Sequence, residues 1–361
     1  MSPLTCLLFD AGLSIEYIRQ RARRFQTSRW ADTTKGNLNS QQRLFIEFCR
    51  RYEIHSFKNV DGQCLIDYAV WLIVSGRLHS VDSVRNYLSA VRTLCHMFGH
   101  DCPTPTTHWE LEWTLIGIRR ELQFPTQRKK PISPGILRFL LTFPSDMYNP
   151  PTNLSWEEQV LMSTIQVTYC LAYFSMLRAS NLMPSSLTKV DKRRLLTWNK
   201  IRRFPGGVVC SITLSKTIQF SEKTHEISLA ERPGSLFCPV AAIRHLVDLR
   251  GRVNCGPDDV LLQVPVNGVW GPLCKDTVVK VMRMQLVRMG LNPDEYAFHS
   301  FRRGGIQEAV RAQPSLELVR LQSGHVSDAI HAYSAMPGEA RMVTVALMLE
   351  SLEQQFYSTS A

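Results

Sequence analysis

Residues 124–134, FPTQRKKPISP, interrupt the chain and limit its fold more than any other stretch. They hold three prolines around the basic triplet Arg128, Lys129 and Lys130. Proline lacks the N–H that a helix needs and biases the residue before it toward extended backbone, so a helix is not expected to run through this stretch. The sequence therefore predicts two domains, 1–123 and 135–361, joined by an exposed basic linker.

The first domain shows helical patterns only. Apolar residues recur with helical spacing in 37–54, 64–76, 81–99 and 108–123. The clearest helix is 81–99, where Asp82 can cap the start and Gly99 can end it. We expect a small helical bundle.

The second domain mixes helices with a short β segment. Helices are predicted at 134–142 and 156–177, again from Pro239 and from Lys275, and in short pieces over 299–357. GGVVCSITL (206–214) and THEISL (224–229) flank the polar turn SKTIQFSEK, which predicts a hairpin with a further strand near 195–198. The fold class is mainly α with a small antiparallel sheet.

Membrane, secreted and zinc-binding classes fit the chain poorly. Polar residues interrupt the apolar run 160–177, so we expect a buried helix rather than a membrane span. The start MSPLTCLLFDAGL lacks the basic region of a secretion signal, and ten scattered cysteines without a CxxC indicate reduced, intracellular thiols. No metal or other cofactor is expected, because the spacing of one His- and Cys-rich segment matches no paired-ligand zinc pattern: Cys95, His96, His100, Cys102 and His108.

The charge balance favours a polyanionic partner. Lys and Arg number 42 against 31 Asp and Glu, a formal net charge of +11. Residues 178–232 alone carry eleven Lys or Arg and four Asp or Glu. Nucleic acid suits such a field, with an anionic membrane and an ordinary solvated surface as alternatives. The triplet at 128–130 could follow a DNA backbone, form part of a nuclear address, or be a solvated linker.

Several residues of the second domain could handle one phosphate. In HSFRRGG (299–305) a helix would place His299 and Arg302 on one face, and the two glycines would admit a close backbone or a phosphate. The guanidinium fork matches two phosphate oxygens. Alone, HxxR is more often structural. Other candidates follow along the chain: Arg178 after the apolar helix, Lys216 in the hairpin turn, His325 at an expected helix start, and Tyr333.

This order of residues resembles the tyrosine recombinase (phage-integrase-like) family. LRASNL, SKTIQF, HSFRRGG and SGHVSDAIHAY carry the resemblance, together with a helical bundle before a basic linker. LRASNLMP and FCPVAAIRHL look most like the eukaryotic mobile-element branch of DIRS-type retrotransposons and Cryptons. The resemblance implies a SAM-like core-binding domain before a catalytic domain.

The resemblance also implies a chemistry. Tyr333 would attack a DNA phosphate to form a 3′-phosphotyrosyl bond, with His299 as its base and Lys216 as the acid for the leaving 5′-oxygen. Arg178, Arg302 and His325 would hold the phosphate, so that no metal is needed. Double-stranded DNA is the expected partner, with Arg128, Lys129, Lys130 and Arg303 as further DNA contacts. A homotetramer on paired sites, integration of a mobile element and a nuclear location are implied as well.

Tyr333 follows His325 by eight residues, where the family usually has nine, and Ser334 stands at nine. The short interval keeps open an inactive DNA-binding protein on a recombinase scaffold. A type IB topoisomerase uses a similar residue set and is the other alternative. The amphipathic tail 339–356 could pack on a neighbouring protomer, as in the family, or on its own domain.

Overall fold

The computed structural model describes residues 14–55, 60–123, 129–142, 154–188, 190–215, 218, 222–251, 255–312, 315–324 and 338–357. The chain forms two compact units, Met1–Gln127 and Arg128–Ala361. The boundary between the units falls inside the proline-rich stretch. The described residues are mainly helical with small antiparallel sheets, as predicted.

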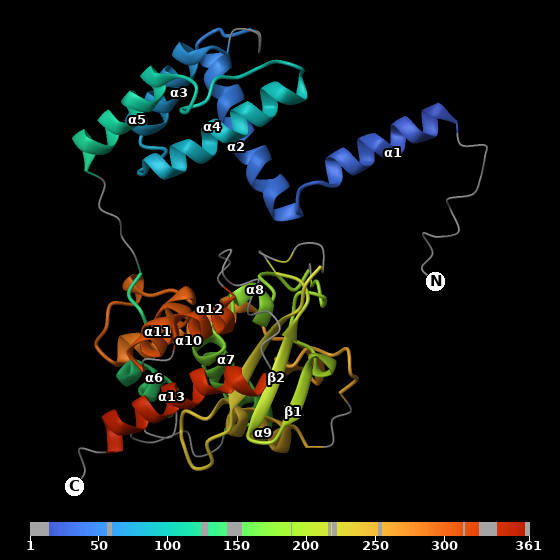
Figure 1. Ribbon diagram of the computed structural model, residues 1–361, viewed down its shortest axis with the longest axis vertical. Helices are drawn as coiled ribbons and strands as arrows, with labels where there is room; N and C mark the ends of the chain where they lie inside the picture. The colour runs from blue at the N-terminus through green and yellow to red at the C-terminus, as the bar shows by residue number, and fades with distance from the viewer. Residues whose placement is uncertain are drawn as a thin grey trace. The chain divides into compact units, whose positions relative to one another are not determined.

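The described part of the first unit is a set of helices (Figure 1): α1 (Ile15–Ser28), α2 (Asp32–Arg51), α3 (Gly62–Val74), α4 (Val81–Met97) and α5 (Trp109–Leu122). Its core is built on aromatic rings of α2 and α3, where Phe45 and the fully buried Tyr68 meet edge to face at 5.0 Å. Ser80, not Asp82, occupies the N-cap of α4, and Asp82 accepts a hydrogen bond from Arg119 at 2.8 Å. Gly99 follows the C-cap of α4 with φ +76°, which a glycine adopts without strain.

The second unit packs helices around a three-stranded sheet (Figure 1). Its helices are α6 (Pro134–Thr142), α7 (Trp156–Phe174), α8 (Ala179–Leu182), α9 (Pro239–Arg250), α10 (Lys275–Arg288), α11 (His299–Arg311), α12 (Leu316–Ser323) and α13 (Gly338–Tyr357), with short 3₁₀ turns η3 (Trp198–Lys200) and η4 (Pro293–Glu295). The antiparallel sheet has the order β1 (Ile201–Phe204), β2 (Gly207–Ile212), β3 (His225–Ala230), and β4 (Gln263–Val266) pairs with β5 (Val269–Pro272).

The predicted hairpin is present as β2 and β3, but the strand predicted near 195–198 is wrong. Within that stretch, Thr197 makes an isolated bridge to Val260, and η3 begins at Trp198. The strand that precedes the hairpin is β1, where Ile201 pairs with Cys210. Because Arg202 and Arg203 stand side by side in β1, the strand lacks the apolar alternation from which a strand is predicted.

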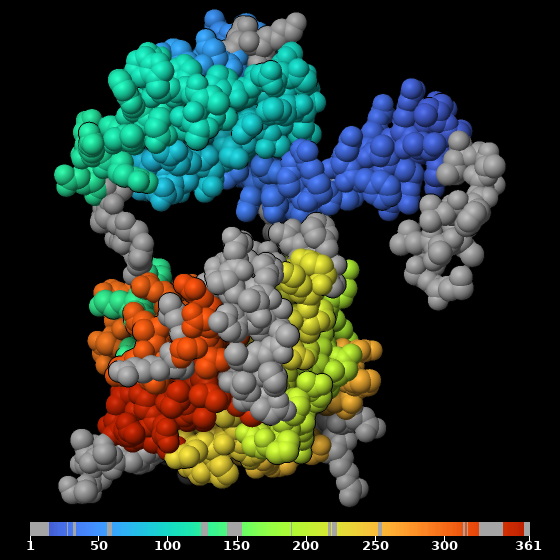
Figure 2. All heavy atoms as spheres, in the orientation of Figure 1, coloured from blue at the N-terminus to red at the C-terminus, as the bar shows by residue number. Residues whose placement is uncertain are grey.

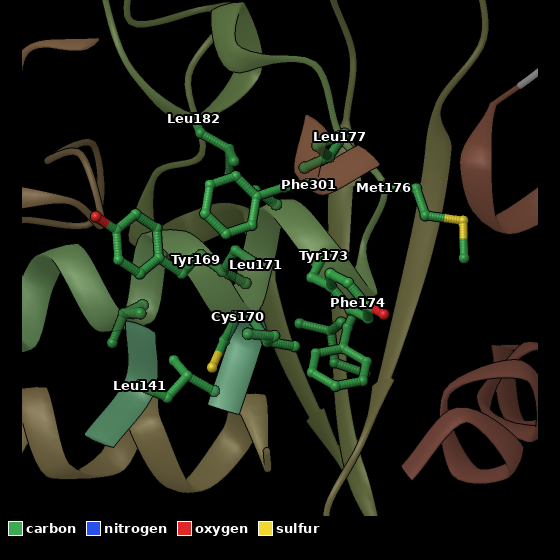
Figure 3. Close-up of a cluster of buried hydrophobic side chains, with 14 of the residues drawn as sticks. Leu141, Tyr169, Cys170, Leu171, Tyr173, Phe174, Met176, Leu177, Leu182 and Phe301 are labelled. Atoms are coloured by element: carbon green, nitrogen blue, oxygen red, sulfur yellow. The ribbon is translucent and has the colours of Figure 1, made fainter. Parts of the chain in front are cut away.

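Helix α7 forms the centre of the second unit. Its C-terminal half is almost wholly buried and packs against α9, α11 and β4. The rings of Tyr169 and Phe301, from α7 and α11, stack at 4.8 Å in the cluster drawn in Figure 3. Thus the helix that precedes Arg178 is fixed on several sides by the core.

Helix α13 packs on its own domain in this structure. Val345, Met348, Leu349 and Leu352 are buried in the core of the second unit, and the helix contacts β3, α11 and α12. In the space-filling view its red surface lies directly against that unit (Figure 2). No helix among the described residues is both long and apolar enough to span a membrane.

Candidate functional site

The chain turns sharply between α7 and Arg178. Helix α7 ends at Phe174, three residues before its predicted end, because Met176 adopts φ +52°. The Ser175 hydroxyl donates to the Leu171 carbonyl, and its oxygen accepts from the Leu177 N–H at 3.2 Å. A buried methionine in left-handed backbone is uncommon and is held here by its surroundings. The turn leads Arg178 out of the core as the N-cap residue of α8.

Helix α11 approaches this turn closely because of Gly304 and Gly305. A Cβ atom on Gly304 would lie 2.0 Å from the Ile132 carbonyl oxygen, and one on Gly305 would lie 2.0 Å from the Tyr173 carbonyl oxygen. The glycines therefore admit another backbone, one of the two alternatives expected from the sequence. Their absent side chains let the start of α11 lie against the end of α7.

Arg302 is buried between two backbone segments. Only 4% of the residue is exposed. Its Nη1 donates to the carbonyl of Met176, and its Nη2 donates to the carbonyl of Ser323 at 2.8 Å. Burial, and to a smaller extent the neighbouring charge of Arg178, lowers the pKa of Arg302 to about 10. Arg302 thus donates to the carbonyl of Met176, two positions before Arg178, and the charge of Arg178 affects its pKa. The two arginines therefore lie in one region.

His299 is the first residue of α11, one turn before Arg302 as predicted. Partial burial lowers its pKa below the ordinary 6.5, and the positive charges of Arg302, Arg303 and Arg178 lower it further. Cationic neighbours disfavour the imidazolium form. The neutral imidazole, which can accept a proton, is therefore the dominant form at neutral pH.

Four predicted residues lie outside the described residues: Arg128, Lys216, His325 and Tyr333. Gly324, directly before His325, ends α12 with φ +65°. The helix start expected at His325 lies outside the described residues. Leu214, two residues before Lys216, is held close to α8, because the Asn181 amide donates to the Leu214 carbonyl at 2.9 Å.

Lys129, Lys130 and Arg303 form a small network at the start of α11. Lys129 donates to the Asp294 carbonyl at 2.6 Å, Lys130 pairs with Glu295 at 2.8 Å, and Arg303 donates to the Lys129 carbonyl. The Lys130 side chain remains 57% exposed. The structure therefore places these three residues together and close to His299, on the second unit.

Solved structures share this architecture. The Tn1549 transposon integrase, in complex with transposon right end DNA, superposes with a TM-score of 0.54 at 12% identity over 90% of this chain and 98% of that chain. The XerH site-specific recombinase, bound to palindromic difH substrate, gives 0.52 at 13% identity over 86% of this chain and 77% of that chain. The chain has the tyrosine recombinase fold. No protein-family model and no curated protein matches it.

Within this recombinase fold, two buried polar residues that the sequence did not single out hold the site together. The Asn181 side-chain amide donates to the carbonyls of Arg194 and Leu214, and the Asn181 backbone carbonyl accepts from the Leu196 N–H. Gln322 bonds to residues of α7 and β3. Asn181 stands in the LRASNL phrase and Gln322 in the segment 299–357 that was expected to be helical, and neither carries a local signal of its role.

The His- and Cys-rich segment 95–109 belongs to the first unit. Cys95 and Cys102 are buried there, Cys95 completely so. Across the ranges described above, no group of three or more His, Cys, Asp and Glu side chains is arranged to hold a metal ion.

Proposed function

We propose that this protein is a DNA strand transferase of the tyrosine recombinase type. The observation that carries the proposal is the contact of Arg302 with the turn before Arg178, beside His299, on a recombinase fold. Two guanidinium groups and a neutral imidazole in one region are the groups needed to hold a phosphate and to accept a proton. The inactive-scaffold alternative rests on the eight-residue interval between His325 and Tyr333, and no contact among the described residues favours it or the topoisomerase.

The proposed reaction breaks one phosphodiester bond and forms one phosphotyrosyl bond. The Tyr333 oxygen attacks phosphorus and gives its proton to His299, while the bond to the 5′-oxygen breaks and Lys216 protonates that oxygen. Arg178, Arg302 and His325 stabilise the added negative charge at phosphorus. A free 5′-hydroxyl from another strand reverses these steps and reseals the backbone, so the reaction needs no ATP.

The proposal also covers the DNA partner, the biological process, the oligomeric state and the cellular location. The named neighbours were solved on DNA, which together with the net charge of +11 supports duplex DNA as partner. The basic side chains Arg128, Lys129, Lys130 and Arg303 would contact its phosphates. Integration of a eukaryotic mobile element, a homotetramer on paired sites and a nuclear location follow from the sequence resemblance.

The proposal is tested by trapping the covalent intermediate. The full chain is incubated with a pool of duplexes, each nicked beside a randomised core so that the short 5′-hydroxyl fragment diffuses away after cleavage. We expect a detergent-resistant protein–DNA adduct, peptide mapping that places the DNA on Tyr333, and no adduct from Tyr333→Phe. Duplex binding without any adduct would instead identify an inactive scaffold. Relaxation of supercoiled DNA without a defined site would identify a topoisomerase.

The lowered pKa of His299 predicts the pH dependence of cleavage. A proton acceptor works only when neutral, and its cationic neighbours keep His299 neutral to a lower pH than usual. When DNA is well below saturation, the rate of adduct formation reports the free protein and should therefore reach half its plateau below pH 6.5, the ordinary histidine value. Arg303→Met removes one of the charges and should move this midpoint upward. A midpoint above 6.5 in the wild type would contradict the assignment of His299 as base.

A further inference from the structure

Gln322, near the end of α12, connects three elements of the second unit. The residue is fully buried. Its Nε2 donates to the Ser228 carbonyl at 2.7 Å and to the Phe174 carbonyl at 3.2 Å, while its Oε1 accepts from the Ser228 N–H at 3.3 Å. One side-chain amide thus binds α12 to β3 and to the C-terminus of α7.

On the β3 side, Gln322 occupies a sheet edge. Among the residues that the structure describes, the sheet has the order β1-β2-β3, so β3 pairs with β2 along one edge and lies at the end of the sheet. By bonding to both the N–H and the carbonyl of Ser228, the Gln322 amide pairs with β3 as the backbone of a further strand would. A second bond lies nearby, where His225 Nε2 donates to the Leu321 carbonyl at 2.7 Å. The last turn of α12 is therefore fixed to β3 at two points.

On the arginine side, Gln322 is linked to both carbonyls that hold Arg302. Ser323, the next residue, accepts from Arg302 Nη2. Phe174, which accepts from Gln322, lies two residues before Met176, which accepts from Arg302 Nη1. The bond from Gln322 to Phe174 therefore fixes the separation between these two acceptors.

We propose that Gln322 is a positioning residue that sets the direction of the Arg302 guanidinium. The role rests on the proposed strand-transfer function, in which Arg302 touches the phosphate and Gln322 does not. An apolar residue could fill the same buried volume, but it would leave the Phe174 carbonyl and the Ser228 backbone groups without this partner. The amide therefore fixes the distance between α7 and α12 in addition to filling space.

The test compares two buried glutamines in the full-length protein. Gln322→Met keeps the length of the side chain and removes its amide. Gln285→Met is the matched control, because Gln285 is 1% exposed, lies on α10 and accepts a 2.8 Å bond from Tyr169. We expect Gln322→Met to slow adduct formation on saturating nicked DNA by about 10- to 100-fold, the scale of a small misplacement of a catalytic group. DNA affinity should change by less than about threefold, and Gln285→Met should cleave at close to the wild-type rate.

A double variant separates positioning from general loosening of the fold. If Gln322 acts only through Arg302, then Gln322→Met combined with Arg302→Lys should be no slower than Arg302→Lys alone. If the two substitutions each slow cleavage and their factors multiply in the double variant, the positioning role is wrong. It is also wrong if Gln322→Met cleaves DNA as fast as Gln285→Met.

A second pair of variants keeps the inference testable if Gln322→Met does not fold. His225→Phe removes the donor to the Leu321 carbonyl, whereas His225→Gln retains a donor. If the last turn of α12 must be held on β3, His225→Phe should cleave DNA more slowly and His225→Gln should recover the rate. Equal rates for these two variants would contradict this requirement. A wild type that forms no adduct would refute the proposed function itself, whereas normal cleavage by Gln322→Met in an active protein would refute only the positioning role.

Discussion

Arg302→Lys is expected to lower the rate of adduct formation by about three orders of magnitude, with a small change in duplex affinity. The guanidinium is a planar group with five donors, and in this structure it bonds to the carbonyls of Met176 and Ser323. A lysine has one ammonium with three donors, which cannot hold both carbonyls in the same geometry while facing a phosphate. Loss of one preorganised donor at a developing negative charge typically costs about 10²- to 10³-fold.

Arg311→Lys is the control for this prediction. Arg311 lies at the other end of α11, is half exposed, and pairs with the buried Glu308, which a lysine can also do. It should retain the wild-type rate. Single-turnover cleavage and a DNA titration separate rate from affinity, and a denaturant titration confirms that each variant is folded. An Arg302→Lys protein that cleaves within about tenfold of wild type would contradict a phosphate-facing role for this arginine.

Gly305→Ala is expected to destabilise the second unit by about 3 kcal/mol or more. The added methyl group would lie 2.0 Å from the Tyr173 carbonyl oxygen, a backbone atom in the buried C-terminal half of α7. Neither α7 nor α11 can move away freely, because Tyr169 and Phe301 stack between them. The result would be a loss of fold or a displaced α11, and with it a displaced Arg302. Urea denaturation of the full chain measures the change.

Gly135→Ala provides the matched comparison. Gly135 lies in α6 with nothing within 4 Å of an added Cβ, and alanine favours a helix by up to about 1 kcal/mol over glycine. This variant should be as stable as the wild type or more so. Equal stability of Gly305→Ala and Gly135→Ala would show that α11 does not pack as closely on α7 as described.

Local sequence patterns predicted the elements that bury a regular apolar face. The stripe of α4 and the β-branched run of β2 are such cases, and each lies within a few residues of its predicted position. The β4–β5 hairpin was missed although it carried a signal. Asn267 and Gly268, both with positive φ, form the Asn-Gly turn that favours tight hairpins, but Pro265 and Pro272 in the short strands obscured it.

The candidate site was predictable in its residue types and not in its supporting contacts. The spacing of His299 and Arg302 on one helix follows from the period of an α-helix. The turn at Met176 and the bonds of Gln322 depend on contacts between distant parts of the chain: Gln322 and Phe174 are 148 positions apart. No local pattern encodes such a pairing, since it arises only when α7, β3 and α12 pack together.

The most direct test of the account replaces the scissile phosphate with an uncharged methylphosphonate. If Arg178 and Arg302 act by neutralising the charge of one phosphate, removal of that charge should make each arginine less necessary. Arg178→Ala and Arg302→Ala, inactive on the phosphodiester, should then form adducts with the methylphosphonate duplex at rates approaching that of the wild type on the same duplex. Folded variants that stay inactive on both duplexes would show that the two arginines do not converge on the phosphate that is cut.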